Sequence, residues 1–268
     1  MSNRTAVPKR EEGIGRPLNP SHPRFDGGVT SVRRFRVTWL EAAICLGVVA
    51  LLAAATYARN RVWNDEVEMW MDVVRKSPGK ARAHSNLGFA YFDAGRYDRA
   101  LEETEKAIQI DPKLAMAYYV RHLALEKMGD ISKAIEVAKK SLEIDPKLHM
   151  AEFSLGKIYL AKEDPEVSVE YFRRFLKAYP YAPEVHHLLG VAYATQKRFD
   201  KAVSEFESEV RVNPSNSLTH LNLGQLYWFE FRDREKAIRH LKTALFLDPF
   251  LPDRAQVQRL VRSLEASS

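Results

Sequence analysis

Apolar and small residues recur along this chain at helical spacing, and the pattern itself repeats about every 34 residues. From Ala81 onward, each period holds two segments whose apolar positions fall on one face of a helix. Prolines mark the same phase of every period: Pro78, Pro112, Pro146, Pro180 and Pro214 lie 34 residues apart, and Pro249 follows 35 later. Because proline cannot continue a helix, these regularly spaced prolines predict one helical hairpin that is repeated and stacked many times, which is an all-α solenoid.

Fixed positions within the period carry fixed residue types. When the periods are counted from Ala81, Ala115, His149, Pro183 and Ser217, positions seven and eight read Leu-Gly in four of five copies, and position eleven is tyrosine in four. Position twenty holds Ala or Ser in the first four copies, and the fifth carries one extra residue. Glycine in the first helix and a small residue in the second let two helix backbones approach closely.

The turns agree with this hairpin. Gly95, Gly129 and the pair Asp164-Pro165 fall between the two helices, and Asp164 suits an N-cap. An Asp-Pro or Asn-Pro pair ends the second helix in most copies. Arg121-His122 replaces Leu-Gly in the second copy, which predicts either a looser hairpin or a charge placed for a partner.

This pattern closely resembles the tetratricopeptide repeat. The resemblance covers residues 81–249 and implies a right-handed α-solenoid of five repeats: 81–114, 115–148, 149–182, 183–216 and 217–250. Residues 251–268 are expected to form a capping helix, with Val257, Leu260, Val261 and Leu264 on one apolar stripe. Residues 61–80 are expected to supply the second helix of a half-repeat, from Asp65 to Lys76.

Charge is concentrated at the start of the chain. Residues 1–36 read as a disordered basic tail that carries +5 of the net +6, so the remainder is close to neutral. The basic balance therefore does not mark the repeats as a nucleic-acid binder.

An apolar run follows the tail and predicts a single transmembrane helix over 37–60. The Lys and Arg counts on its two sides tie, but the cluster from Arg33 to Arg36 favours a cytoplasmic N-terminus with extracytoplasmic repeats, periplasmic if the protein is bacterial. The alternatives are a cleaved signal peptide, with a site at Ala53–Ala55 and a secreted product, and a buried helix of a soluble protein. Cys45, the one cysteine, lies within this run, so no intramolecular disulfide is possible.

The junction from Arg59 to the first repeat resembles the C-terminal portion of transmembrane, tetratricopeptide-containing O-mannosyltransferase-like proteins. The acidic catalytic loop of that family has no counterpart here. The resemblance implies an alternative function: an accessory or truncated subunit of a membrane glycosyltransferase or polysaccharide-assembly system.

No constellation typical of an enzyme, a cofactor site or a metal site occurs in the sequence. We therefore predict no catalysis, no cofactor and no metal. His84, His186 and His220 recur at position four, and we interpret them as packing residues.

The predicted function is a membrane-anchored scaffold for protein–protein interaction. In tetratricopeptide arrays the inner groove is lined by the first helices. The resemblance assigns these residues to it: Phe89, Phe92, Tyr119, Leu123, Phe153, Lys157, Leu160, His187, Val191, Leu221, Asn222, Gln225, Trp228 and Phe229. The charged set of a carboxylate clamp is absent, with Ser85, Phe89 and Val120 among the residues in its positions. The expected partner is an apolar or amphipathic peptide segment or helix of another protein, or a second copy of the array.

Overall fold

The structure is a computed structural model that describes residues 39–62 and 65–266, so the predicted tail over 1–36 lies outside the described residues. Within them the chain is entirely helical, with thirteen helices and no strand. The helices are α1 (Trp39–Val62), α2 (Glu66–Lys76), α3 (Ala81–Asp93), α4 (Tyr97–Ile110), α5 (Ala115–Lys127), α6 (Ile131–Ile144), α7 (His149–Ala161), α8 (Pro165–Ala178), α9 (Val185–Thr195), α10 (Phe199–Val212), α11 (Ser217–Phe229), α12 (Arg234–Leu247) and α13 (Arg254–Ala266).

Helix α1 corrects the expectation for the apolar run. Among the residues that the structure describes, no helix combines the length and the apolar content needed to cross a bilayer. The predicted single-pass topology, with its cytoplasmic N-terminus and extracytoplasmic repeats, is therefore wrong.

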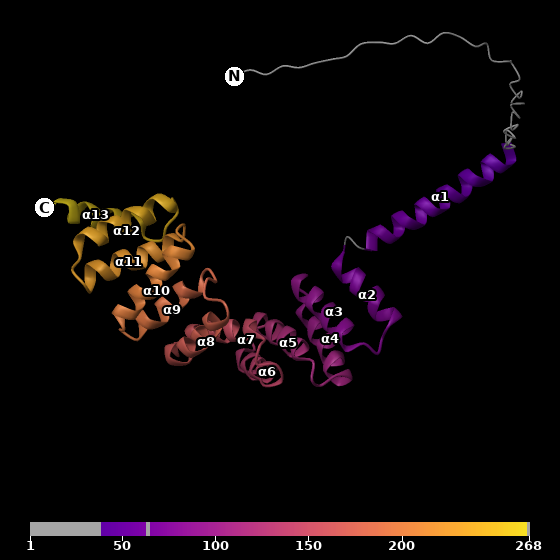
Figure 1. Ribbon diagram of the computed structural model, residues 1–268, viewed down its shortest axis with the longest axis horizontal. Helices are drawn as coiled ribbons and strands as arrows, with labels where there is room; N and C mark the ends of the chain where they lie inside the picture. The colour runs from indigo at the N-terminus through magenta and orange to yellow at the C-terminus, as the bar shows by residue number, and fades with distance from the viewer. Residues whose placement is uncertain (1–38, 63–64, 267–268) are drawn as a thin grey trace, which may run out of the picture. The chain divides into compact units, whose positions relative to one another are not determined.

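Helices α2 to α13 form a repeat array, and Figure 1 shows them following one another as paired hairpins. Within each repeat the two helices pack together: α3 with α4, α5 with α6, α7 with α8, α9 with α10, and α11 with α12. Each second helix also contacts the first helix of the next repeat, and α13 packs on α12. One buried apolar cluster runs through the C-terminal half, from Val169 to Leu264.

Glycine allows the two helices to approach closely in four of the five hairpins. A Cβ added at Gly156 would lie 2.6 Å from Phe172 Cε1, and one added at Gly190 would lie 2.6 Å from Phe206 Cδ1. The rings of Phe172 and Phe206 are almost fully buried. In these two repeats the second helix places an aromatic ring in the space that glycine leaves open, whereas Gly88 faces Thr104 and Gly224 faces Leu241.

The second helices end where the sequence predicts, each two residues before a proline, at Ile110, Ile144, Ala178, Val212 and Leu247. Asp164 caps α8 by accepting the Val167 N–H at 3.3 Å. Helix α9 differs, because it begins at Val185 and not at Pro183. Glu184, the residue after Pro183, has left-handed backbone with a φ of 72°, so the helix begins only at the next residue.

The turn inside every repeat contains a residue with left-handed backbone. These residues are Gly95 (φ 71°), Gly129 (84°), Glu163 (59°), Lys197 (58°) and Arg232 (57°). In three repeats, therefore, a residue with a Cβ occupies a position that favours glycine.

Replacing Lys197 with glycine is expected to raise the free energy of unfolding. Left-handed backbone costs a non-glycine residue about 1–2 kcal/mol, and the extra freedom of glycine in the unfolded chain offsets part of that, leaving a gain of up to about 1 kcal/mol. Urea unfolding followed by circular dichroism measures the change. Gly95→Ala, the opposite exchange at the same turn position, should lose about 1 kcal/mol. A lower stability for Lys197→Gly would contradict this account.

The second repeat accommodates Arg121-His122 without loosening its hairpin. His122 is fully buried, and its Nδ1 lies 3.0 Å from the carbonyl oxygen of Ala134 in α6. Arg121 forms an ion pair of 2.8 Å with Glu105 in α4. Both side chains therefore bind within the array, and burial lowers the pKa of the His122 imidazole.

The two ends of the array are covered by single helices. Asp65 caps α2 by accepting the Val67 N–H at 2.9 Å, and Val67 packs with Leu87 and Ala90 of α3. At the other end Val257, Val261 and Leu264 of α13 are buried. These contacts bury apolar faces that a terminal hairpin would otherwise expose.

Candidate functional site

The groove residues expected from the sequence all lie on the first helices α3, α5, α7, α9 and α11, but their exposure differs. Phe229 and Phe89 are 52% and 40% exposed, whereas Tyr119 and Leu221 are each only 9% exposed. Lys157 and Gln225 are exposed. The others are half-buried: Phe92, Leu123, Phe153, Leu160, His187, Val191, Asn222 and Trp228.

Four of these residues line one hollow of about 310 Å³ between α9, α10 and α11. Its lining consists of Val191, Ala194, Thr195, Phe206, Asn222, Gln225, Leu226, Phe229 and Glu230. We call this hollow the C-terminal groove site. The sequence predicted Val191, Asn222, Gln225 and Phe229 as members.

The sequence-based prediction missed the other members for identifiable reasons. Ala194 and Thr195 occupy groove positions of the period, but their small side chains do not stand out in the sequence as binding residues. Phe206 belongs to the second helix, and its ring reaches the hollow through the space left by Gly190. The sequence signal that could have placed this ring there is the pairing of glycine at position eight of the repeat with phenylalanine at position twenty-four.

The chemistry of the site is mainly apolar, with a few polar groups. Val191, Ala194, Phe206, Leu226 and Phe229 offer hydrocarbon surface. The side-chain amides of Asn222 and Gln225 add hydrogen-bond donors and acceptors, and Glu230 is the charged group of the lining. A site of this kind suits a ligand with an apolar side chain and adjacent polar groups.

Several predicted groove residues instead pack within the array. The Phe153 ring lies 5.3 Å from the Phe175 ring and 6.2 Å from that of Phe172, and Lys157 Nζ lies 5.4 Å from the centre of the Phe153 ring. His187 Nδ1 lies 2.8 Å from Thr219 Oγ1, which joins α9 to α11. Burial lowers the pKa of His187.

The aromatic residues of the first repeat form a separate group. Phe89 and Phe92 have ring centroids 6.2 Å apart, and Phe92 lies 5.8 Å from Tyr97. All three belong to α3 and α4, so they do not contribute to the C-terminal groove site. The structure therefore divides the predicted groove into separate aromatic regions.

A second apolar hollow, of about 580 Å³, lies at the end of the third repeat and was not predicted. Met150, Phe175, Tyr179, Pro180 and Tyr181 are among its lining residues, and Tyr181 is 82% exposed. Tyr179-Pro180 stands where other repeats have Asp-Pro or Asn-Pro.

Among the described residues, no group of three His, Cys, Asp or Glu side chains is placed to hold a metal ion.

Comparison with known proteins gives consistent results. Tetratricopeptide repeat models match residues 81–114, 115–148, 153–217 and 187–252, which together are more than half of the chain. No curated protein matches it.

Solved structures have the same fold. One is YrrB, described as a TPR protein with an unusual peptide-binding site, with 21% identity, a TM-score of 0.63, and coverage of 73% of this chain and 99% of YrrB. MamA of Desulfovibrio magneticus RS-1, from residue 41 of its own chain to the end, has 22% identity and a TM-score of 0.58, covering 62% of this chain and 94% of that one.

The matches do not extend to every resemblance drawn from the sequence. Neither the family models nor these structures support the likeness of the junction to O-mannosyltransferase-like proteins. The predicted repeats, in contrast, are confirmed over almost the whole array. The chain belongs to the tetratricopeptide repeat family.

Proposed function

We propose that this protein is an interaction scaffold that binds an apolar or amphipathic peptide segment of a protein partner at the C-terminal groove site. The observation that carries the proposal is the hollow between α9, α10 and α11, where four groove residues expected from the sequence meet. Phe229 is the most exposed aromatic residue of its lining. Exposed aromatic side chains beside a hollow are the usual anchors of protein binding.

The architecture supports a binding role. Repeat arrays present extended surfaces, and each helix pair can contribute contacts along a bound segment. YrrB, which shares the fold, is described as having a peptide-binding site. In this chain the apolar lining would take an apolar side chain, and the amides of Asn222 and Gln225 would bind backbone groups of the segment.

Replacing Phe229 with alanine is expected to weaken peptide binding at least tenfold, which corresponds to about 1.4 kcal/mol. The probe is a peptide selected from a displayed random library against the full chain, and its Kd is measured by fluorescence anisotropy. Gln225→Ala should weaken binding by a smaller factor, because it removes hydrogen bonds that water can replace.

Phe246→Ala is the matched control, since Phe246 is an 85% exposed phenylalanine of α12 and is not part of the lining. It should leave the Kd unchanged. Phe89→Ala tests the distant aromatic group on α3. Equal affinity of wild type and Phe229→Ala, with both folded, would overturn the assignment. A loss confined to Phe89→Ala would move the site to the first repeat.

A further inference from the structure

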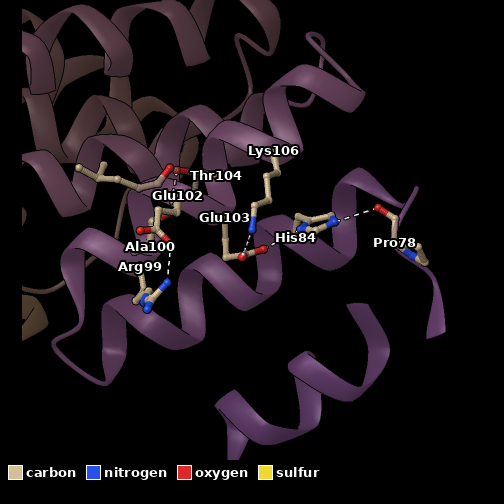
Figure 2. Close-up of polar contacts among 9 residues, drawn as sticks. Pro78, His84, Arg99, Ala100, Glu102, Glu103, Thr104 and Lys106 are labelled. Carbon is tan, nitrogen blue, oxygen red and sulfur yellow. Dashed lines mark hydrogen bonds and ion pairs between the residues drawn. The ribbon is translucent and has the colours of Figure 1, made fainter. Parts of the chain in front are cut away.

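A histidine at position four joins the loop before a repeat to the second helix of that repeat. In the first repeat, His84 Nε2 lies 2.9 Å from the carbonyl oxygen of Pro78, and Nδ1 lies 2.6 Å from Glu103 Oε2 (Figure 2). The fourth repeat has the same contacts: His186 Nε2 lies 3.0 Å from the Pro180 oxygen, and Nδ1 lies 2.7 Å from Glu205 Oε2. Each of these histidines thus faces two acceptors.

The fifth repeat replaces the carboxylate with a second histidine. His220 Nε2 lies 3.1 Å from the carbonyl oxygen of Pro214, and its Nδ1 lies 3.0 Å from His240 Nδ1. His240 occupies the position of α12 that corresponds to Glu103 in α4 and Glu205 in α10. Both rings are buried, with His220 6% and His240 8% exposed. We call these two residues the histidine pair.

Hydrogen-bond chemistry limits how many protons the pair can hold. A carbonyl oxygen only accepts, so the His220 Nε2 must carry a proton and donate it to Pro214. When His220 is neutral, its Nδ1 is an acceptor and the proton in the contact belongs to His240. One added proton leaves a buried positive charge on the pair without a carboxylate in contact. A second added proton would place an N–H group on both Nδ1 atoms, so that two donors face each other.

The surrounding groups do not supply a carboxylate partner. Glu207 of α10 faces His240, but it accepts the Tyr227 hydroxyl at 2.7 Å. The Tyr227 ring of α11 stacks on His240 with centroids 5.7 Å apart, and Arg239 and Lys236 of α12 add positive charge. Burial, followed by His220 and Arg239, lowers the pKa of His240 to about 4, and burial also lowers that of His220.

We infer that the histidine pair makes the fifth repeat acid-sensitive, so that α12 and the α13 cap separate from α11 more readily below about pH 6 than at neutral pH. This inference stands apart from peptide binding. Both helices belong to the last repeat, and a terminal repeat of a solenoid can open without unfolding the others.

The direction of this pH dependence follows from the difference between the pKa of His240 in the folded state and in the unfolded state. Because the folded pKa of His240 lies below the unfolded value of about 6.5, the unfolded state binds more protons between about pH 6.5 and 4. The stability contribution is thus present above pH 6.5 and is lost as the pH falls through that window. The contribution of His186 to stability depends on pH in the opposite direction. Glu205 raises its pKa, so its contribution is present below about pH 6.5 and is lost as the pH rises through the raised value.

Amide hydrogen exchange of the full chain at pH 7 and pH 5, corrected for intrinsic exchange rates, tests the inference. Protection of α12 and α13 amides should fall at least about tenfold at pH 5, with a smaller change in α3 and α4. His240→Gln retains an amide donor to His220 without a titrating group, so the loss of α12 and α13 protection at pH 5 should become smaller. His240→Glu recreates the His–Glu contact of the first and fourth repeats. The change in protection between pH 7 and pH 5 should then have the opposite sign.

A transplanted pair completes the test. Glu103→His places a second histidine against His84 in the first repeat and should make α3 and α4 acid-sensitive. An equal loss of α12 protection in wild type, His240→Gln and His240→Glu would assign the effect to other groups, such as His187, and overturn the inference. Full protection of wild-type α12 at pH 5 would overturn it as well.

Discussion

Replacing Phe172 with alanine is expected to lower the free energy of unfolding by about 3–5 kcal/mol. Phe172 is 0% exposed and belongs to the main apolar cluster. Its ring lies against Gly156 of the facing helix and 6.2 Å from the Phe153 ring. Truncation removes these contacts and leaves a cavity that two rigid helices cannot close.

Urea unfolding followed by far-UV circular dichroism measures this loss. Phe246→Ala is the control, because the Phe246 side chain is 85% exposed and its removal should change stability by less than about 0.5 kcal/mol. A loss below about 1 kcal/mol for Phe172→Ala would show that the hairpin of the third repeat collapses around the missing ring.

Replacing Gly156 with alanine should destabilise the array by about 1–3 kcal/mol, although alanine is the better helix former. The added Cβ would lie 2.6 Å from Phe172 Cε1 and 2.7 Å from Cδ1. These ring atoms belong to a fully buried side chain, so α7 and α8 must move apart. Gly190→Ala should cost less, because its neighbour Phe206 borders the C-terminal groove site and has space to shift.

The same unfolding experiment separates steric overlap from backbone effects. Gly79→Ala is the matched control, since nothing lies within 4 Å of a Cβ added there. It should be neutral or slightly stabilising. In the Phe172→Ala background, Gly156→Ala should no longer destabilise, and a cost that persisted without the ring would rule out the overlap as its cause.

Most of the array could be predicted from the sequence because its determinants are local. Proline after Ile110 and Ile144 ends a helix whatever surrounds it, and glycine at position eight permits a close helix contact. The late start of α9 does not follow from the repeat period, which places Pro183 at the first helical position. Apolar content favoured a membrane helix for α1, but none of the described helices is both long and apolar enough to cross a bilayer.

The candidate site was predicted only in part. Groove positions follow from the repeat, and four of the predicted groove residues, Val191, Asn222, Gln225 and Phe229, line the hollow. Position alone does not tell a residue that lines a hollow from one that packs, as Phe153 does. His84, His186 and His220 were interpreted as packing residues, yet each also bonds a proline carbonyl oxygen six residues earlier.

The family, the period and the ends of most helices can be predicted from the amino-acid sequence alone, because proline, glycine and apolar spacing act through the backbone of their own segment. Which groove residues meet in one hollow, and which histidines face carboxylates or each other, is known only from the folded array. Those outcomes depend on atoms about twenty or more residues apart, whose distances are set by how the helices of the array pack.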